Sequence, residues 1–317
     1  MSKQNSAPIL VTMGEPAGIG PEVAVQAYKA LGGSIGHRRL KLVGDPSVFA
    51  ACGLGSGADP IATRAQARRA PGRPDSANAR AVTEAIEDAV TLAMSGRAAA
   101  IVTAPINKAV LMHAGFAYPG HTEFLQALTA APRAVMMLAS DKLRVAPLTI
   151  HVPLAQVPGA ITTTAIIETA EIILTALERD FAIGSPRLAV AGLNPHAGED
   201  GVLGKEDGAI IAPAVAYLRA RGHAVHGPLP ADTLFHDEAR TRYDAALCMY
   251  HDQALIPIKT LSFWDGVNVT LGLPIVRTSP DHGTAFDIAG TGQADARSMI
   301  AAIEMAARMA DARATVR

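Results

Sequence analysis

The stretch that decides the fold is Ile9-Leu-Val-Thr-Met13 followed by Gly14-Glu-Pro-Ala-Gly-Ile-Gly-Pro21. The first part is a short apolar run, which predicts a buried strand. The second part is a glycine-rich loop, and Pro21 suits the first turn of a helix that we expect to continue through Ala30. A strand, a loop and a helix in this order are typical of an α/β sheet that binds ligands at the carboxyl ends of its strands.

The same alternation of strand and helix continues to the end of the chain. Short apolar runs predict strands, and apolar residues at helical spacing predict helices. The expected strands are 40–43, 99–103, 134–138, 144–150, 188–191 and 245–249, and the expected helices are 79–96, 160–179, 205–222 and 292–313. Residues 53–78 are rich in Gly, Ala, Pro, Arg and Ser and predict a loop with at most one edge strand. The pattern predicts a doubly wound α/β protein in which any second domain is inserted within the first.

Composition limits the classes of function. The 317 residues suit one large domain or two coupled ones, and 49% are hydrophobic but only 4% aromatic. A net charge of −1 argues against nucleic-acid binding, and no long uncharged apolar run predicts a membrane span. The two cysteines, Cys52 and Cys248, and the lack of a signal-peptide pattern favour a reducing, cytoplasmic location.

Three histidines follow predicted strands and are candidate metal ligands. His151 comes after the run 144–150, His196 lies just beyond 188–191, and His251 follows 245–249. Because strand ends at one edge of a sheet converge, the three imidazoles can meet, and such a set with an open position suits a catalytic divalent ion. Each histidine taken alone is better explained as a structural, hydrogen-bonding residue, and only the set of three makes a metal site an equal alternative.

Other polar residues are candidates for binding an anion. In Gly120-His121-Thr122-Glu123, we expect a tight turn that caps a helix, with Thr122 as the N-cap and free backbone amides for an anion; the simpler interpretation is a cap alone. Lys259 and Arg277 end apolar runs, where a cation meets either an anion or water. Asn268 lies within a strand-like run and needs a partner if it is buried.

The usual cofactor and hydrolase signatures are missing. Gly14, Gly18 and Gly20 form neither a dinucleotide fingerprint nor a P-loop, and Gly290-Thr-Gly292 lacks the third glycine and the preceding strand. The sequence has no G-x-S-x-G, C-x-x-C or H-E-x-x-H pattern, so it gives no support to serine-hydrolase or zincin chemistry.

Seven motifs nevertheless resemble one family over nearly the whole chain. They are Gly14-Glu-Pro-Ala-Gly-Ile-Gly-Pro-Glu22, Thr103-Ala-Pro-Ile-Asn-Lys108, Gly120-His-Thr-Glu123, Gly192-Leu-Asn-Pro-His-Ala-Gly-Glu199, Gly227-Pro-Leu-Pro-Ala-Asp-Thr-Leu-Phe235, Tyr250-His-Asp-Gln253 and Arg277-Thr-Ser-Pro-Asp-His-Gly-Thr-Ala285. In this order they resemble the 4-hydroxythreonine-4-phosphate dehydrogenases of pyridoxal phosphate biosynthesis. Asp281-His-Gly-Thr-Ala-Phe-Asp-Ile-Ala-Gly290 also resembles the cofactor segment of isocitrate and isopropylmalate dehydrogenases, which bind NAD(P) without the usual glycine fingerprint.

The resemblance implies a role for each matching residue. It implies that His151, His196 and His251 hold a divalent metal (zinc, magnesium or cobalt) shared across a homodimer. The substrate contacts that it implies are His121, Thr122, Lys259, Asn268 and Arg277, with Lys259 as a possible catalytic proton acceptor or a phosphate ligand. Contacts to NAD or NADP are implied for His282, Gly283 and Asp287. Residues 53–78 and the neighbourhood of Trp264 match nothing familiar.

The implied fold is a pair of α/β/α domains of the isopropylmalate dehydrogenase type, with the active site in the cleft between them. One domain is expected to combine 1–125 with 282–317, and the other, 126–281, is expected to carry most metal ligands.

The implied reaction is a metal-dependent, NAD(P)-linked oxidation of 4-(phosphooxy)-L-threonine. The resulting β-keto acid loses CO₂ to give 3-amino-2-oxopropyl phosphate. Alternatives at this stage are a dehydrogenase of threonate or erythronate phosphates or of a dihydrodiol, a phosphate acyltransferase of similar fold, and a non-catalytic binder of metal and phosphate.

Overall fold

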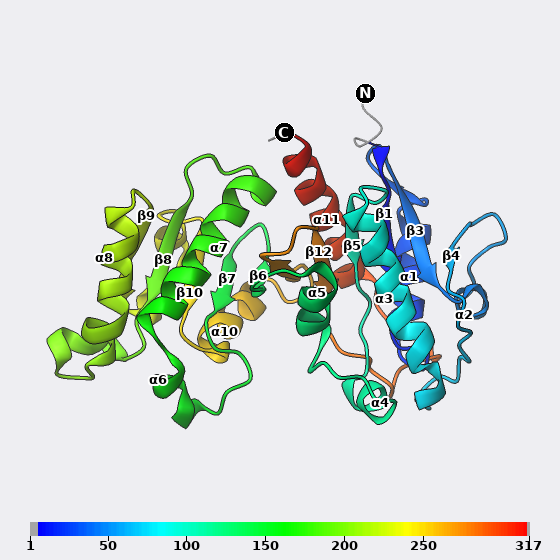
Figure 1. Cartoon of the computed structure of the whole chain (residues 1–317), viewed down its shortest axis with the longest axis horizontal. Coiled ribbons are helices and arrows are strands. Elements are labelled where there is room, and N and C mark those ends of the chain that lie inside the picture. Colours follow the sequence, from blue (N-terminus) through cyan, green and yellow to red (C-terminus); the bar gives the residue numbers. More distant parts are fainter. Residues whose placement is uncertain (1–5, 316–317) are drawn as a thin grey trace. The chain divides into compact units, whose positions relative to one another are not determined.

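Strands and helices alternate along the chain in the computed structural model, which describes residues 6–315 (Figure 1). The predicted α/β class is confirmed. The chain forms two compact units. Unit 1 combines the residues up to Ala134 with those from Val267 onward, and unit 2 is Val135–Gly266. The predicted domains, 1–125 with 282–317 and 126–281, have other bounds and stay a prediction.

Unit 1 contains a mainly parallel sheet. Its strands are β1 (Ile9–Thr12), β2 (Ser34–Ile35), β3 (Arg38–Gly44), β4 (Ile61–Ala62), β5 (Ala100–Val102), β11 (Val267–Leu271) and β12 (Arg277–Pro280). They lie in the order β2-β3-β1-β5-β12-β11, and β4 pairs with β3. Ile9 of β1 lies opposite Leu40 of β3 and Ala100 of β5, both in parallel register. Only the β2–β3 and β11–β12 pairs described in this sheet are antiparallel.

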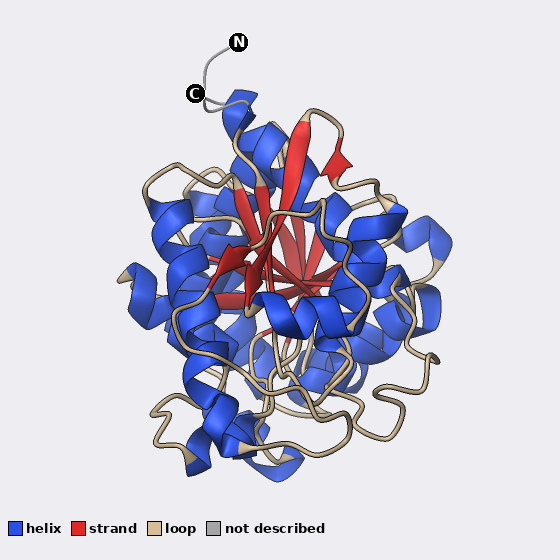
Figure 2. Cartoon of the chain, turned by 90° about the vertical axis from the view of Figure 1, so that its right-hand side faces the viewer, coloured by secondary structure: helices blue, strands red, loops and turns tan. Residues whose placement is uncertain are grey.

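Helices cover both faces of this sheet. They are α1 (Gly20–Ala30), α2 (Pro46–Ala51), α3 (Ala79–Met94), α4 (Lys108–His113), α5 (His121–Thr129) and α11 (Arg297–Thr315). α1 contacts α11, whereas α3 contacts α5, and Figure 2 shows helices on both sides of the strands. Since two faces are covered, the short strands are buried on both sides, which explains their continuous apolar runs.

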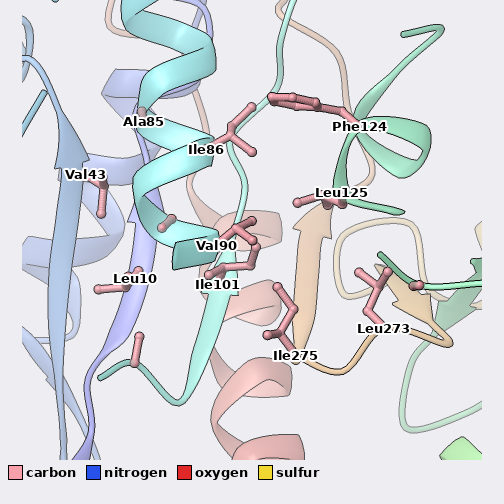
Figure 3. Close-up of a cluster of buried hydrophobic side chains, with 13 residues drawn as sticks. Leu10, Val43, Ala85, Ile86, Val90, Ile101, Phe124, Leu125, Leu273 and Ile275 are labelled. Carbon is pink, nitrogen blue, oxygen red and sulfur yellow. The ribbon is translucent and has the colours of Figure 1, made fainter. Parts of the chain in front are cut away.

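The core of unit 1 fixes the start of α5. Leu10 and Ile101 from the sheet, Ile86 from α3, and Phe124 and Leu125 from α5 form one buried cluster (Figure 3). Phe124 is 5% exposed and Leu125 is fully buried. Burial of side chains of this size contributes about 1.5–3 kcal/mol each, so α5 is held firmly on the sheet and α3.

Unit 2 contains a second mainly parallel sheet. Its strands, β6 (Val135–Ala139), β7 (Arg144–Pro147), β8 (Arg187–Ala191), β9 (Ala224–Leu229) and β10 (Ala245–Cys248), lie in the order β6-β7-β10-β8-β9. β10 is parallel to both β7 and β8, while β6 is antiparallel to β7. The helices are α6 (Val157–Ala160), α7 (Thr163–Phe181), α8 (Ala212–Ala220), α9 (Asp237–Arg240) and α10 (His251–Leu261). Ala254, Leu255 and Ile258 anchor α10 in the core of this unit.

Several expectations about elements were incomplete. Sequence reasoning missed α2, β9 and α10, because α2 is short, β9 contains glycine and proline, and α10 contains Pro257. Arg277 was expected at the end of an apolar run; the structure shows that it also begins a strand, β12. The edge strand expected within 53–78 is β4, which pairs with β3.

Within the described residues, no single helix is long and apolar enough to cross a membrane. The helix pair Leu154–Ala160 and Thr163–Phe181 passes that test jointly, by length and composition alone, with a bend of 90° between its halves.

Candidate functional site

Unit 1 contains a buried arginine, Arg277, whose charge, like that of Lys108, acts on His121. We call these three residues the cationic cluster. Arg277, at the start of β12, is 3% exposed. Its Nε and Nη2 donate to Thr103 Oγ1 at 3.1 and 2.6 Å, and its Nη1 donates to Thr270 Oγ1 at 2.8 Å. Burial lowers the pKa of this guanidinium to about 10. Its hydrogen bonds within residues 6–315 reach neutral hydroxyls, so a bound anion would stabilise its charge.

His121 adds an unpartnered nitrogen to the cluster. It is the first residue of α5, and its Nε2 is buried without a hydrogen-bond partner among the described residues. Burial, together with the charges of Arg277 and Lys108, holds the pKa of His121 well below its usual range. The ring is therefore neutral at physiological pH. A phosphate in this place would accept a hydrogen bond and reduce the repulsion between the cations.

The helix that carries His121 and Thr122 begins differently from the prediction. Gly120, and not Thr122, is the N-cap of α5, and it supplies no side-chain cap. Thr122 lies in the first turn and is partly buried. The prediction of Thr122 as N-cap was therefore wrong, whereas the availability of backbone amides at this helix start is unchanged. Asn268 lies in β11 as expected, partly buried and opposite Ser279 of β12.

The segment 281–290 follows β12 in unit 1 and contains the three predicted cofactor contacts. His282 Nδ1 lies 3.0 Å from the carbonyl oxygen of Gly283, while His282 Nε2 is buried without a partner among the described residues. Asp287 and Gly283 are exposed. An unpartnered buried ring nitrogen beside exposed polar groups is a feature that a polar ligand would satisfy, so these residues fit the proposed cofactor.

A buried ion pair fixes that segment to the first glycine loop. Glu22 Oε1 accepts the amide of Gly290 at 2.7 Å and pairs with Arg69 Nη2. Arg69 Nη1 also donates to the carbonyl oxygen of Pro16 at 2.6 Å. A Cβ on Gly18 would lie 2.7 Å from the carbonyl oxygen of Thr284, so only glycine allows this close approach. The first glycine loop and Arg69 thus hold segment 281–290 in place, although the three are distant in sequence.

The three candidate metal ligands all belong to unit 2 and follow adjacent parallel strands. His151 lies beyond β7, His196 beyond β8, and His251 directly begins α10 after β10. Since β10 pairs with both β7 and β8, the three carboxyl ends lie at one edge of the sheet. The expected placement of the histidines is therefore what the backbone provides.

Two of these three rings lie near each other. The ring centroids of His151 and His251 are 6.3 Å apart. His251 Nδ1 lies 2.7 Å from Asp252 Oδ1, which leaves the Nε2 atom of His251 available to a metal. His196 is not brought into the pair: among residues 6–315, no three His, Cys, Asp or Glu side chains form a group that would hold a metal ion. Among the described residues, His151 and His251 therefore provide two imidazoles that suit a divalent metal, but not a complete set of ligands.

Buried side chains connect the loops that carry the histidines. Thr149 Oγ1 donates to the carbonyl oxygen of Met249 at 2.8 Å, joining the loops of His151 and His251. Gln253 accepts the amide of Met249 at 2.7 Å and donates to the carbonyl oxygen of Gly192 at 2.8 Å. These bonds hold the three loops in fixed relation at their bases.

Lys259, the candidate proton acceptor, lies in the last turn of α10 and is exposed. It follows His251 by two helical turns on the same helix. Sequence reasoning missed Thr103, Thr270, Lys108 and Asp252, which contact or influence the predicted residues. The family resemblance rests on motifs that include Thr103, Lys108 and Asp252. Their position in these motifs was the sequence signal that could have identified them as site residues.

Comparisons with known proteins agree on one family. A family model described as pyridoxal phosphate biosynthetic protein PdxA matches residues 42–306. A protein of Roseobacter denitrificans named 4-hydroxythreonine-4-phosphate dehydrogenase is 53% identical over 321 residues, which cover 96% of this chain and 98% of the relative. One of the same name from Bradyrhizobium diazoefficiens is 47% identical and covers 99% of this chain and 100% of its own.

A solved structure gives the same result. The crystal structure of 4-hydroxythreonine-4-phosphate dehydrogenase from Klebsiella pneumoniae matches with a TM-score of 0.85 and 39% identity. The match covers 96% of this chain and all of that one, so the two proteins share one fold.

Proposed function

This chain belongs to the PdxA family of 4-hydroxythreonine-4-phosphate dehydrogenases. We propose that its residues form three sites for one oxidation reaction: a phosphate site, a metal site and a nicotinamide site. The chain is an enzyme, a dehydrogenase of pyridoxal phosphate biosynthesis. The proposed substrate is 4-(phosphooxy)-L-threonine. Its hydroxyl is oxidised, and the β-keto acid that results loses CO₂ to give 3-amino-2-oxopropyl phosphate.

The cationic cluster of unit 1 is the proposed phosphate site. Arg277 donates through a planar fork that matches phosphate oxygens, and Thr103 and Thr270 hold that fork in place. His121 and Thr122 add donors at the start of α5, and Asn268 binds a further polar group of the substrate. The buried Arg277, whose hydrogen-bond partners among residues 6–315 are threonine hydroxyls, is the observation that carries this part of the proposal.

The histidines of unit 2 are the proposed metal ligands. His151 and His251 have the donor chemistry for Zn²⁺ or Co²⁺, and Mg²⁺ would need added oxygen ligands. Asp252 orients the His251 ring. His196 completes the set, and a second copy of the chain contributes to the same centre in a homodimer.

Chemistry at the hydroxyl needs an acceptor for a hydride and one for a proton. When bound, a divalent metal would lower the pKa of the substrate hydroxyl, and NAD⁺ or NADP⁺ would accept the hydride from the carbon that bears this hydroxyl. Lys259 accepts the hydroxyl proton. His282, Gly283 and Asp287 hold the cofactor, and the Glu22–Arg69 pair fixes their segment. The proposal includes a cytoplasmic location, which suits an enzyme with two free thiols, Cys52 and Cys248.

The alternatives considered from sequence receive less support. A relative that is 53% identical over almost its full length is named 4-hydroxythreonine-4-phosphate dehydrogenase. This similarity does not favour threonate phosphate, erythronate phosphate or a dihydrodiol as the substrate. An acyltransferase or a non-catalytic binder would not belong to this enzyme family.

The test is a nicotinamide absorbance assay with 4-(phosphooxy)-L-threonine and either NAD⁺ or NADP⁺, repeated after a chelator and after metal is restored. We expect reduction that stops with the chelator. His196→Ala should lose both metal and turnover while its circular dichroism spectrum is retained, because it truncates an exposed loop side chain. Unchanged metal content in that variant would contradict the ligand assignment, and no absorbance change with either cofactor would contradict the cofactor assignment.

A further inference from the structure

The residues that carry His196 adopt an unusual backbone. His196, Ala197, Gly198, Glu199 and Asp200 all have positive φ angles, of 52, 53, 83, 42 and 52°. Five such residues in succession form a turn of left-handed helix. L-residues other than glycine are crowded in this region, because Cβ approaches the following carbonyl oxygen. Such a turn persists only where its surroundings hold it, and strain of this kind is concentrated at functional sites.

A buried carboxylate lies at the base of this turn. Asp207 is 1% exposed and stands between the turn and α8. It accepts the amide of Leu193 at 2.7 Å, the amide of Asn194 at 3.2 Å and the side-chain Nδ2 of Asn194 at 2.8 Å. These are the residues that lead from β8 into the turn. A carboxylate with several amide donors is well satisfied when buried, so the bonds are strong ones.

The same carboxylate also lies close to the turn at Gly198. A Cβ on Gly198 would lie 3.2 Å from Asp207 Oδ2 and 2.9 Å from the carbonyl oxygen of Gly204. The main chain of the turn therefore packs directly on Asp207. The side chain therefore bonds to the residues that enter the turn and packs near Gly198 within it.

We infer that Asp207 is a positioning residue for His196: its buried carboxylate holds the left-handed turn that carries this imidazole, a proposed ligand of the divalent metal. The inference rests on the proposed metal site and goes beyond it, since Asp207 is not itself a ligand. Asp207 acts on the backbone of the turn, as Asp252 acts on the ring of His251. Outer residues of this kind typically change metal affinity by about 10- to 100-fold.

The chain offers a matched control at the other end of the same strand. Asp244 also accepts a backbone amide, that of Arg187 at 2.8 Å, where β8 begins. Its side chain is 18% exposed, and it lies at the end of β8 remote from His196. Asp244→Asn therefore removes a comparable structural carboxylate without touching the turn.

The experiment is a Co²⁺ titration of the metal-free full-length protein, followed by the visible absorption of the bound ion. Asp207→Asn should weaken Co²⁺ binding by about 10- to 100-fold, and Asp244→Asn should leave it within about twofold of wild type. Hydrogen exchange should accelerate at amides 193–200 in Asp207→Asn and stay unchanged in Asp244→Asn. If Asp207→Asn does not fold, Asn194→Ala removes a bond partner of Asp207 and should weaken Co²⁺ binding in the same direction.

The outcomes separate the two proposals. Equal Co²⁺ affinity of wild type and Asp207→Asn overturns the inference and leaves the metal site intact. Equal weakening by Asp207→Asn and Asp244→Asn overturns it too, because general destabilisation then explains the loss. A wild-type protein that binds no Co²⁺ overturns the proposed metal site, and the positioning role falls with it.

Discussion

The cationic cluster of unit 1 and the histidines of unit 2 are organised in opposite ways. Arg277 is buried in β12 and donates to the hydroxyls of Thr270 in β11 and Thr103 just beyond β5. His151 and His196 are exposed on loops, and only two of the three imidazoles lie near each other. A rigid sheet therefore prepares the anion site in advance, whereas the histidine set depends on loop conformation and on added ligand. Pre-formed sites lose less entropy on binding.

The largest effect that we expect comes from the arginine. Arg277→Met should lower kcat/KM for the phosphorylated substrate by about 30-fold or more, since removing one member of a buried charge pair costs about 2–5 kcal/mol. Inorganic phosphate should raise the Tm of wild type but not of this variant. The measurements are steady-state kinetics and a thermal shift with phosphate.

Two further variants test whether the effect of Arg277→Met is specific to this arginine. Arg277→Lys retains the charge but loses the fork, so we expect partial recovery of phosphate binding. Arg97→Met alters an exposed arginine and should behave as wild type. If Arg277→Met still responds to phosphate, unit 1 has no pre-formed anion site and the comparison fails.

The second prediction asks whether the rigidity of unit 1 extends to segment 281–290. Arg69→Met should lower the free energy of unfolding by about 3 kcal/mol, because it leaves the buried Glu22 carboxylate without its cation. The side chains of Arg69 and Glu22 are only 8% and 10% exposed. Urea unfolding measures the loss.

The control for this pair is another arginine near it in sequence. Arg64 pairs with Glu84, but its side chain is 86% exposed, so Arg64→Met should lower the free energy of unfolding much less than Arg69→Met does. Equal losses in the two variants would mean that the Glu22–Arg69 pair is no more important than a surface contact.

The third prediction concerns the pH dependence of stability. The pKa of folded His121 lies well below its usual value, so below about pH 6.5 the unfolded chain binds a proton that the folded chain does not. Stability should therefore fall as pH decreases, by at most about 1.4 kcal/mol per pH unit from this residue. His121→Gln should remove that part of the slope.

Urea unfolding at about pH 7.5 and about pH 5.5 measures the slope in each variant. His113→Gln changes an exposed histidine and should retain the wild-type dependence. An identical slope in His121→Gln would show that burial and the nearby charges of Arg277 and Lys108 do not keep this ring neutral.

The alternation of elements and the strand ends were predictable from sequence, whereas the conformation of the histidine loops was not. The run 9–13 and the glycine loop predicted β1 and α1, because apolar periodicity is a local signal. The left-handed turn at His196 depends on Asp207, which lies far enough along the chain to escape any local pattern. Likewise the burial of Arg277 depends on Thr103, a residue from another strand region.

The smallest expected effect concerns His251, whose ring is oriented by the Asp252 carboxylate. Asp252→Asn weakens the bond to His251 Nδ1, and we expect Co²⁺ affinity to fall by up to about tenfold. The effect is limited because the Asp252 side chain is 70% exposed and water screens its charge. Asp237→Asn, in the exposed helix α9, is the control and should leave Co²⁺ binding unchanged. A loss as large as that expected for Asp207→Asn would mean that ring orientation, rather than loop conformation, limits the histidine site, which would reverse the contrast between the two units.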